Sequence, residues 1–376
     1  MKILLGGIPL GCDNIGDEAI LAGVAGMLKE SVPGVGLTVA TADRDTARLL
    51  GVNVVPPYGF AGVPLDGFAE TVRSHDAYVW CGATGLSDYP HVALDLLEIA
   101  QTEGVKTFVW GVGMDDELNP VFFKAHGRRR ILLKLFGLAG AYERSLRSRL
   151  AKRISSVLPR CAGVWLRDPQ SAAMLAKTGF AGAGVAADSA ILLARGRTRP
   201  APGGPNPPVL GLCISAQRQV SDVGGLAGFV AEVRASGAKI VGIPMNPKTD
   251  RALLEKLGVE CISGTSPEAV MEAASKCSAV LSSRLHLLIL AANAGTPGLG
   301  IARGSKLANW LSNFGRDVEG GVYDCDWRKV AAHAIAALED RGDWDAARDA
   351  AYAKLEARLE NARREFVARL EGAHGK

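Results

Sequence analysis

Short apolar runs alternate along the chain with longer stretches in which apolar residues recur at helical spacing. In the first half, the apolar runs occupy residues 2–6, 36–40, 77–81, 107–112, 163–166 and 185–190. Strands that are apolar on both faces and separated by helices are typical of a parallel sheet with helices on its two sides. Asp168 and Pro169 fit the start of one such helix, as N-cap and first helical residue. The first half therefore predicts a Rossmann-like domain.

The same alternation begins again in the second half. Strands are expected at residues 208–214, 239–243, 260–262, 279–282 and 298–301, and helices at 225–236, 248–257, 267–274 and 285–294. Residues 196–208 contain five prolines and three glycines and separate the two patterns. Beyond Gly342, apolar residues at helical spacing in a charged stretch predict one long helix at 344–371.

These patterns predict an α/β fold of two Rossmann-like domains facing a cleft. The expected N-terminal domain covers residues 1–195, the linker 196–208 and the C-terminal domain 209–340, and a helix within 341–376 packs across the junction. A length of 376 residues supports two domains, because it exceeds the size at which one hydrophobic core usually stops growing.

Cysteine usage and hydropathy indicate a cytoplasmic protein. The seven cysteines form no CxxC pair and leave one over, which fits neither a zinc site nor a disulfide framework. The N-terminal apolar stretch is too short for a signal peptide. The longest uncharged apolar run, residues 287–302, is shorter than the ~20 residues needed to cross a bilayer. We therefore expect a reducing compartment and no membrane span.

Basic residues concentrate in one segment. Residues 121–160 hold eleven Lys/Arg and one acidic residue, a net charge of +10, whereas the rest of the chain has 32 basic and 38 acidic residues. The interpretation we favour slightly is a solvated helical face. The alternative is peripheral contact with anionic lipid headgroups at the inner face of the cell membrane, or with the pyrophosphate of a lipid-linked sugar. Nucleic acid fits less well, because the segment has few aromatic residues for stacking.

A glycine-containing loop follows the first predicted strand and opens the first helix. Its residues Asn14, Gly16 and Asp17 lie where free helix amides favour an anion. The loop is not a GxGxxG sequence, which argues against a dinucleotide site. Two interpretations stay open at even weight: a ligand-binding loop, or a tight turn in which Asp17 caps the helix.

Ser283-Arg284-Leu285-His286 stands between a predicted strand and an apolar helix. Ligands of open α/β sheets bind at the carboxyl ends of the strands. Arg284 offers a planar fork suited to phosphate or carboxylate, and His286 can donate a proton near neutral pH. A lone histidine at a helix start is usually structural, but beside an arginine at this edge we favour a functional role.

Two further segments with basic residues follow predicted strands. Arg303, Gly304, Ser305 and Lys306 offer amides, a hydroxyl and an ammonium group to a phosphate. Arg167 ends another strand, just before a predicted helix. Taken singly, each charge is explained at least as well by solvation or by an ion pair. Taken together, they favour an anion site.

Four motifs occur in the order that one known family shows. They are Gly-x-x-Asn-x-Gly-Asp-Glu-Ala-Ile-Leu at 11–21, Val-Trp-Leu-Arg-Asp-x-x-Ser at 164–171, Ala-Ala-Asp-Ser-Ala at 186–190, and Ser-Arg-Leu-His at 283–286 followed by Ala-x-x-Ala-Gly-Thr-Pro. Together they resemble the polysaccharide pyruvyl transferase family over about residues 2–314. The resemblance is closest to bacterial members that pyruvylate cell-wall polysaccharide precursors, which implies a part in S-layer anchoring.

The resemblance implies a GT-B-like fold and phosphoenolpyruvate as co-substrate, with no other cofactor. By matching positions, it assigns Arg284 and His286 to the family's Arg-Leu-His motif and Arg167 to its Arg-Asp/Glu-x-x-Ser motif. It assigns Asn14, Gly16 and Asp17 to the N-terminal loop. We place the sugar acceptor near Thr84 and Asp88, in a segment that departs from the family's usual Gly-Gly-Gly stretch.

Ketal formation from phosphoenolpyruvate requires an acid and cations for carboxylate and phosphate. We expect His286 to be the general acid. Arg284, Lys306 and the Ser305 amide would hold phosphate, and Arg167 the carboxylate or phosphate, with the two arginine roles exchangeable. No metal is required, because fixed cations and helix amides meet the developing charge. The alternatives are a GT-B glycosyltransferase that takes a nucleotide sugar and a non-catalytic sugar-binding relative.

Overall fold

The computed structural model describes residues 1–43, 45, 50–116, 118–196, 205–216 and 220–372. The chain divides into two compact units. Unit 1 comprises Met1–Cys12, Leu28–Asp188 and Arg358–Lys376, and unit 2 comprises Asp13–Met27 and Ser189–Ala357. The glycine loop from Asp13 onward thus groups with the second half of the chain. Of the expected linker, residues 197–204 lie outside the described residues.

Unit 1 is built on a parallel seven-stranded sheet in the order β3-β2-β1-β4-β5-β6-β7. Its central strands bury both faces, and Trp80, Trp110 and Trp165 are among its largest fully buried side chains. The strands are β1 (Lys2–Gly6), β2 (Gly36–Ala40), β3 (Asn53–Val55), β4 (Ala77–Cys81), β5 (Lys106–Val112), β6 (Gly163–Leu166) and β7 (Gly184–Val185).

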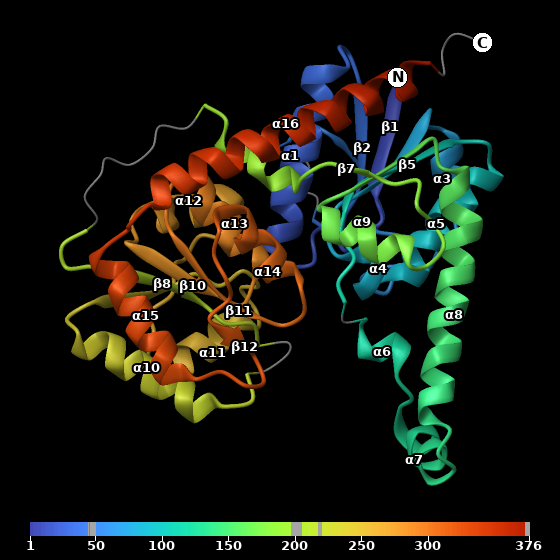
Figure 1. Cartoon of the computed structure of the whole chain (residues 1–376). Helices are drawn as coiled ribbons and strands as arrows, with labels where there is room; N and C mark the ends of the chain where they lie inside the picture. Colours follow the sequence, from blue (N-terminus) through green and yellow to red (C-terminus); the bar gives the residue numbers. More distant parts are fainter. Residues whose placement is uncertain (44, 46–49, 117, 197–204, 217–219, 373–376) are drawn as a thin grey trace. The chain divides into compact units, whose positions relative to one another are not determined.

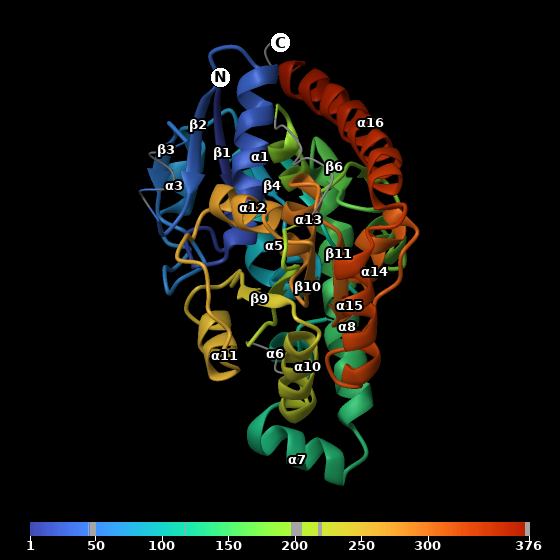
Figure 2. The same cartoon turned by 90° about the vertical axis from the view of Figure 1, so that its left-hand side faces the viewer.

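The helices of unit 1 include a long projection (Figures 1 and 2). Helix α8 extends away from the sheet and carries α7 at its far end. The helices are α3 (Phe68–Arg73), α4 (Gly85–Asp88), α5 (Pro90–Thr102), α6 (Pro120–Phe123), α7 (Gly127–Leu135), α8 (Ala139–Val157), α9 (Pro169–Ala176) and the 3₁₀ helix η1 (Leu158–Arg160). As expected from the sequence, the Asp168 side chain caps α9, because it accepts a hydrogen bond from the Ser171 amide.

Unit 2 is built on a parallel five-stranded sheet in the order β12-β11-β10-β8-β9. The strands are β8 (Val209–Cys213), β9 (Lys239–Gly242), β10 (Ala279–Ser282), β11 (Gly298–Ala302) and β12 (Gly320–Gly321). The helices are α10 (Val223–Ala235), α11 (Asp250–Lys256), α12 (Pro267–Ser275), α13 (Leu285–Asn293), α14 (Lys306–Leu311), α15 (Trp327–Glu339), and the 3₁₀ helices η2 (Ser189–Ala194) and η3 (Ser312–Phe314).

Helices cover both faces of this sheet. Figure 1 shows α10 and α15 on one side and α12 and α13 on the other. Phe229 of α10 and Trp327 of α15 form a core with Leu212 and Leu281 of the sheet. Helix α13 is apolar all round and every residue in it except His286 is buried, which is typical of a helix enclosed by protein. Its first turn therefore has a fixed position.

Two helices have one part in each unit. They are α1 (Ile15–Ser31) and α16 (Trp344–Glu371), which confirms the predicted long C-terminal helix. Within unit 2, the Trp344 indole donates to the Gly295 carbonyl at 3.2 Å. Within unit 1, the Phe366 ring lies 5.3 Å from the Trp110 ring and 5.8 Å from the Trp165 ring. Each end of α16 is thus anchored by its own aromatic contacts.

Two expected strands are wrong. The segment 185–190 pairs only through β7, because its neighbour β6 ends at Leu166, and from Ser189 the chain forms η2. The segment 260–262 forms a single parallel bridge between Cys261 and Gly242, because the chain then turns toward α12. Both errors arise where an apolar run lacks a neighbouring strand long enough to pair with.

Candidate functional site

The strand order of unit 2 reverses between β8 and β10. From β8 the sheet continues to β9 on one side, and from β10 to β11 and β12 on the other. The crevice at the carboxyl ends of two such strands is the usual ligand site of an open α/β sheet. Here the Ser215 amide, after β8, donates to the Ser283 hydroxyl, after β10, at 2.8 Å. The two loops that border the crevice are therefore tied together.

Ser282 fixes the backbone at the start of α13. The Arg284 amide donates to the Ser282 Oγ at 2.8 Å, and the same hydroxyl donates to the Arg284 carbonyl at 2.8 Å. Arg284 is the N-cap of α13 and has an extended backbone. Because Ser282 is fully buried, this double contact is shielded from water. The Arg284 side chain consequently leaves the sheet edge in a defined direction.

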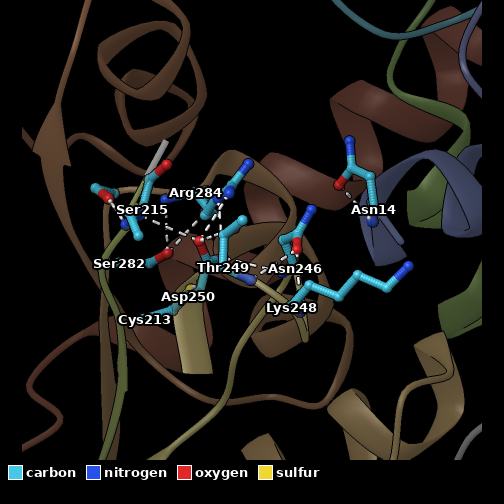
Figure 3. A network of polar contacts seen from close by, with 12 residues as sticks. Asn14, Cys213, Ser215, Asn246, Lys248, Thr249, Asp250, Ser282 and Arg284 are labelled. Atoms are coloured by element: carbon cyan, nitrogen blue, oxygen red, sulfur yellow. Dashed lines mark hydrogen bonds and ion pairs between the residues drawn. The ribbon is translucent and has the colours of Figure 1, made fainter. Parts of the chain in front are cut away.

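Asp250 holds the Arg284 guanidinium in a bidentate ion pair (Figure 3). Arg284 Nε donates to Oδ2 at 3.1 Å, and Nη2 donates to Oδ1 at 2.8 Å. The Asp250 side chain is fully buried, and that of Arg284 is 18% exposed. Parallel N–H···O bonds of this kind fix the plane of the guanidinium as well as its position.

The Asp250 carboxylate also collects donors from the loops around it. Oδ2 accepts from the Asn246 amide at 2.9 Å, and Oδ1 from the Ala216 amide at 3.2 Å and the Thr249 hydroxyl at 3.3 Å. Figure 3 shows these groups converging on the carboxylate. One buried acid thus joins the loops that follow β8, β9 and β10.

Asp250 is absent from the sequence prediction. The expected helix at 248–257 makes it an ordinary first-turn residue, whereas in the structure Asp250 begins α11 and points into the sheet edge. The available signal was the polar run Asn246-Pro247-Lys248-Thr249-Asp250 directly after a strand. An isolated buried carboxylate is costly, so such a residue at a strand end has a cation as its expected partner.

The surroundings of Arg284 keep its guanidinium protonated. Burial alone lowers the pKa of the guanidinium, but the Asp250 carboxylate, with smaller contributions from Cys213 and Asp17, raises the pKa of Arg284 above its ordinary value. Asp250 occupies Nε and Nη2. In the described part of the chain, no hydrogen bond or ion pair engages Nη1, so this end of the fork is available to an anion.

The glycine loop joins unit 2 beside the β9 loop. The Ile15 amide donates to the Met245 carbonyl at 3.0 Å, and Lys248 Nζ lies 2.6 Å from Asp13 Oδ2. Figure 3 shows Lys248 extending toward the side on which Asn14 lies. The N-terminal loop therefore lies beside the loop that follows β9.

Gly16 makes close contact with His286. A Cβ atom placed on Gly16 would lie 2.2 Å from His286 Nδ1 and 2.5 Å from its Cγ, closer than such atoms approach in proteins. The Nδ1 side of the imidazole therefore packs against the first turn of α1, and only glycine leaves it room. This contact gives the glycine of the N-terminal motif a physical function in positioning the histidine.

Asn14 caps the first turn of α1. The Gly16 amide donates to Asn14 Oδ1 at 3.3 Å, and the Asp17 and Glu18 amides donate to the Asn14 carbonyl. Asn14 Nδ2 in turn donates to Asp17 Oδ2 at 2.7 Å. Asp17 is buried and contributes its negative charge near Arg284. The side chains of Asn14 and Asp17 are thus linked to each other in the first turn of α1.

The phosphate loop predicted at 303–306 follows β11, the neighbour of β10 in the sheet. Gly304 has φ +77°, and Ser305 is the N-cap of α14. Arg303, Ser305 and Lys306 are partly buried. Because both strands are parallel, this loop and Ser283–His286 emerge at the same edge of the sheet.

Arg167 lies in unit 1, at the end of β6. Its side chain is 6% exposed, and Nε donates to Asp168 Oδ2 at 3.2 Å. Among the residues that the structure describes, buried Nη1 has no hydrogen-bond partner. A Cβ atom on Gly113 would lie 2.5 Å from Nη2, so the guanidinium lies flat on the backbone after β5. A buried guanidinium with an unmet donor favours an anionic ligand.

Thr84 and Asp88 also belong to unit 1, in and before α4. Thr84 is buried, its carbonyl accepts from the Asp88 amide, and the neighbouring Ala83 carbonyl accepts from the Gly113 amide. The expected acceptor residues and Arg167 therefore flank the same Gly113 loop, at the carboxyl edge of the first sheet. They form a second group, described separately from the site of unit 2.

Within the described ranges, no group of three His, Cys, Asp or Glu side chains is arranged to hold a metal ion. No helix in that part of the chain is both long and apolar enough to span a bilayer.

Comparison with known families decides the relationship. A family model described as polysaccharide pyruvyl transferase matches residues 14–305, which include the glycine-loop motif from Asn14 onward and the whole Arg-Leu-His motif. The chain belongs to the polysaccharide pyruvyl transferase family. Membership identifies it as a transferase that moves pyruvyl groups to polysaccharide. Among curated protein sequences, no relative matches the chain.

Solved structures with a similar fold are distant in sequence. A UDP-GlcNAc 2-epimerase from Neisseria meningitidis bound to UDP-GlcNAc has 11% identity and a TM-score of 0.54, covering 96% of this chain and 100% of its own. The Methanocaldococcus jannaschii UDP-GlcNAc 2-epimerase has 10% identity and a TM-score of 0.54, with coverages of 93% and 98%. A ugt transferase from Siraitia grosvenorii has 10% identity and a TM-score of 0.53, with coverages of 98% and 99%. These likenesses confirm the GT-B-like fold.

Proposed function

We propose that this pyruvyl transferase uses phosphoenolpyruvate as donor and forms a pyruvate ketal on two hydroxyls of a sugar, releasing phosphate. The proposed acceptor is a cell-wall or exopolysaccharide precursor in the cytoplasm, carried on a lipid pyrophosphate. The observation that carries this proposal is Arg284, held by buried Asp250 at the strand-order reversal, two residues before His286. The site offers a fixed cation and an acid at one sheet edge.

The reaction needs a proton on the methylene carbon of phosphoenolpyruvate. Protonation makes C2 electrophilic, and a sugar hydroxyl attacks C2. The C–O bond to phosphate then breaks, and a second hydroxyl closes the ketal ring. The two sugar hydroxyls lose two protons in all. One replaces the proton that was added to the methylene carbon to form the new methyl group, and the other leaves with the phosphate. The proton count therefore balances without a further reactant.

His286 is the proposed acid and proton carrier. It gives its proton to the methylene carbon and recovers one from the attacking hydroxyl. Gly16 supports this role, because the contact with the glycine backbone limits the positions of the imidazole. General acid catalysis of this kind contributes about 10²–10⁴-fold to the rate.

Arg284 is the proposed phosphate ligand in unit 2. Its Nη1 end points away from Asp250, and the charge is maintained because the ion pair raises the pKa of the guanidinium. Lys306, Arg303 and the amides at Gly304 and Ser305 follow the neighbouring strand and would complete the phosphate site. Fixed donors of this kind stabilise the leaving phosphate without the cost of reorganisation.

Arg167 is the proposed ligand of the phosphoenolpyruvate carboxylate, although either arginine fits either anion. Its buried, unmet Nη1 donor supports an anionic ligand. Thr84 and Asp88, near the same Gly113 loop, are the proposed acceptor contacts. A role of the product in S-layer anchoring remains part of this proposal.

The decisive experiment incubates the protein with phosphoenolpyruvate and a panel of lipid-linked aminosugar precursors. The expected result is phosphate release together with a mass gain on the sugar. His286→Ala should reduce turnover by about 10²–10⁴-fold. His333→Ala, a change of an exposed histidine on α15, is the matched control and should leave turnover unchanged.

Three outcomes would contradict the proposal. Turnover of His286→Ala near the wild-type rate would remove this residue from acid catalysis. Consumption of a nucleotide sugar in place of phosphoenolpyruvate would indicate a glycosyltransferase. Binding of the acceptor without phosphate release, under conditions where a positive-control enzyme turns over, would indicate a non-catalytic sugar-binding protein.

A further inference from the structure

Helix α7 and its flanking residues 121–138 form a surface that we call the basic tip. No residue of α7 is buried. Six of the nine exposed large hydrophobic side chains in the described part of the chain lie in the basic tip: Val121, Ile131, Leu132, Leu135, Phe136 and Leu138. Leu135 is 75% exposed and Phe136 is 72% exposed. Such a concentration of exposed apolar groups is a mark of an interaction surface.

The apolar residues of α7 share one side of the helix. At about 100° per residue, Ile131, Leu132 and Leu135 project within an arc of about 100°. Leu133 is only partly buried on another side, and the Arg129 guanidinium lies 4.4 Å from the Tyr142 ring of α8. One side of α7 therefore rests on α8, while the residues of the apolar arc are exposed and no element among the described residues covers them.

Positive charge surrounds this apolar arc. The basic tip has five Lys/Arg and no acidic residue. Arg128, Arg130 and Lys134 are exposed, and no ion pair engages them within the described residues. By contrast, Arg153 and Arg160, near the sheet end of the segment, pair with Asp95 or Glu98 of α5. Two arginines of the segment thus support the fold, whereas the charges of the tip have no acid opposite them.

Helix α7, which forms most of the basic tip, lies at the end of a projection. Figures 1 and 2 both show α7 at the far end of α8, away from the sheet of unit 1. A flat surface can therefore meet the tip without contacting that sheet. Neither the core of unit 1 nor its strand edges require α7 for burial of apolar groups, because α7 itself contributes none.

We propose that the basic tip binds the surface of an anionic lipid bilayer. Its apolar arc would enter the boundary between headgroups and acyl chains, and its flanking Arg and Lys side chains would contact lipid phosphates. A soluble polyanion would match the charges but leave Ile131, Leu132 and Leu135 in water. A second copy of the chain would match the apolar arc but bring like charges together. A bilayer satisfies both features.

This inference concerns an interaction that the proposed pyruvyl transfer does not require. It would hold the enzyme at the surface where lipid-linked sugars reside. Because binding is measured without phosphoenolpyruvate, its outcome is independent of the test of the reaction.

The test is sedimentation of the full-length protein with vesicles of phosphatidylcholine, with or without phosphatidylglycerol. Wild-type protein should sediment with the anionic vesicles, and less so as salt rises. We expect the charge variant Arg128→Gln/Arg130→Gln/Lys134→Gln to lower the partition coefficient on the order of 100-fold. The reason is that each basic residue near the surface raises the partition coefficient by about fivefold. A control variant, Arg328→Gln/Lys329→Gln/Lys354→Gln, removes three exposed charges from other helices and should bind more strongly than the tip variant.

A second variant separates insertion from charge. Ile131→Gln/Leu135→Gln keeps every charge and should lower partition by at least about tenfold, because both side chains lose apolar transfer energy. Val223→Gln/Tyr323→Gln, at exposed positions of unit 2, is its control and should bind like wild type. Far-ultraviolet circular dichroism of each variant verifies folding, which is expected because α7 is solvent-exposed.

Two results would overturn the proposal. One is wild-type protein that stays in the supernatant with anionic vesicles at low salt. The other is tip variants that sediment as strongly as their matched controls. A dimer that the Ile131→Gln/Leu135→Gln variant dissociates, without vesicle binding by wild type, would instead assign the apolar arc to a second copy.

Discussion

Replacing Asp250 with asparagine tests the organisation of the site in unit 2. Both carboxylate oxygens accept from a backbone amide and from the Arg284 guanidinium. Whichever way the new amide is oriented, its NH₂ group therefore faces N–H donors. The substitution removes a buried charge while the Arg284 charge remains, and it adds a donor where only acceptors fit.

The expected cost follows from burial. Asp250 is fully buried and the Arg284 side chain is 18% exposed. Water can therefore do little to stabilise the Arg284 charge once its partner is removed. Removing one partner of a buried ion pair destabilises a protein by about 3–5 kcal/mol. We expect Asp250→Asn to lower the free energy of unfolding of unit 2 by about 3 kcal/mol, at the lower end because one oxygen still accepts. The affinity for phosphoenolpyruvate should fall as well, because the guanidinium plane is no longer fixed.

The assay is urea unfolding followed by tryptophan fluorescence, with phosphoenolpyruvate binding by calorimetry. The two units can unfold separately, so the transition assigned to unit 2 is compared between variants. Asp345→Asn is the matched control, because it removes a carboxylate from the exposed Arg341–Asp345 pair. This control should change the unfolding free energy by less than about 1 kcal/mol.

A double-mutant cycle with Arg284→Gln identifies the cause. If the unpaired charge on Arg284 causes the loss of stability, Asp250→Asn should lower the free energy of unfolding much less in the Arg284→Gln background. The reasoning fails if the free energy of unfolding of unit 2 in Asp250→Asn lies within about 0.5 kcal/mol of the wild-type value. It also fails if the costs of the two substitutions simply add.

Three further predictions concern other parts of the molecule. Gly16→Ala should lower turnover by about 10²-fold, because the new methyl group displaces the His286 ring, and phosphate release measures this. Burial raises the pKa of the Cys277 thiol from 9.0 to about 12, so its stabilising effect, present below about pH 9, is lost as pH rises toward 12. Cys277→Ala should therefore flatten the alkaline fall in unfolding free energy, by up to about 1.4 kcal/mol per pH unit. Phe366→Ala should destabilise unit 1 by about 3–5 kcal/mol in urea unfolding, since it removes a fully buried ring.

Controls keep these predictions specific. No atom lies within 4 Å of a Cβ placed on Gly26 of the same helix α1. Gly26→Ala should therefore keep full turnover and stabilise the helix by about 0.5–1 kcal/mol. Equal turnover of the two glycine variants would remove Gly16 from positioning His286. Parallel pH curves would show that the pKa of Cys277 is the same in the folded and unfolded states, so that burial does not raise it. An unchanged unfolding transition in Phe366→Ala would show that this ring does not stabilise the unit 1 core.

The sequence predicted the central strands and Ser283–His286 because short apolar runs and a polar interruption give local signals. It missed Asp250, because its partner Arg284 is 34 residues away and the local pattern is that of a solvated helix. The contact of Gly16 with His286 joins opposite ends of the chain and has no local signal. The turn interpretation of the N-terminal loop named only Asp17 as a cap, whereas Asn14, three residues earlier, accepts from the Gly16 amide.

The path of α16 has a consequence for synthesis on the ribosome. The seven strands of unit 1 are translated well before residues 358–372, which supply the Phe366 ring that packs on Trp110 and Trp165. Until that ring emerges, a nascent chain holds an aromatic surface without its cover, and exposed apolar surface of this kind is prone to aggregation. The sheet of unit 1 therefore cannot acquire all its native contacts before the last helix has been translated.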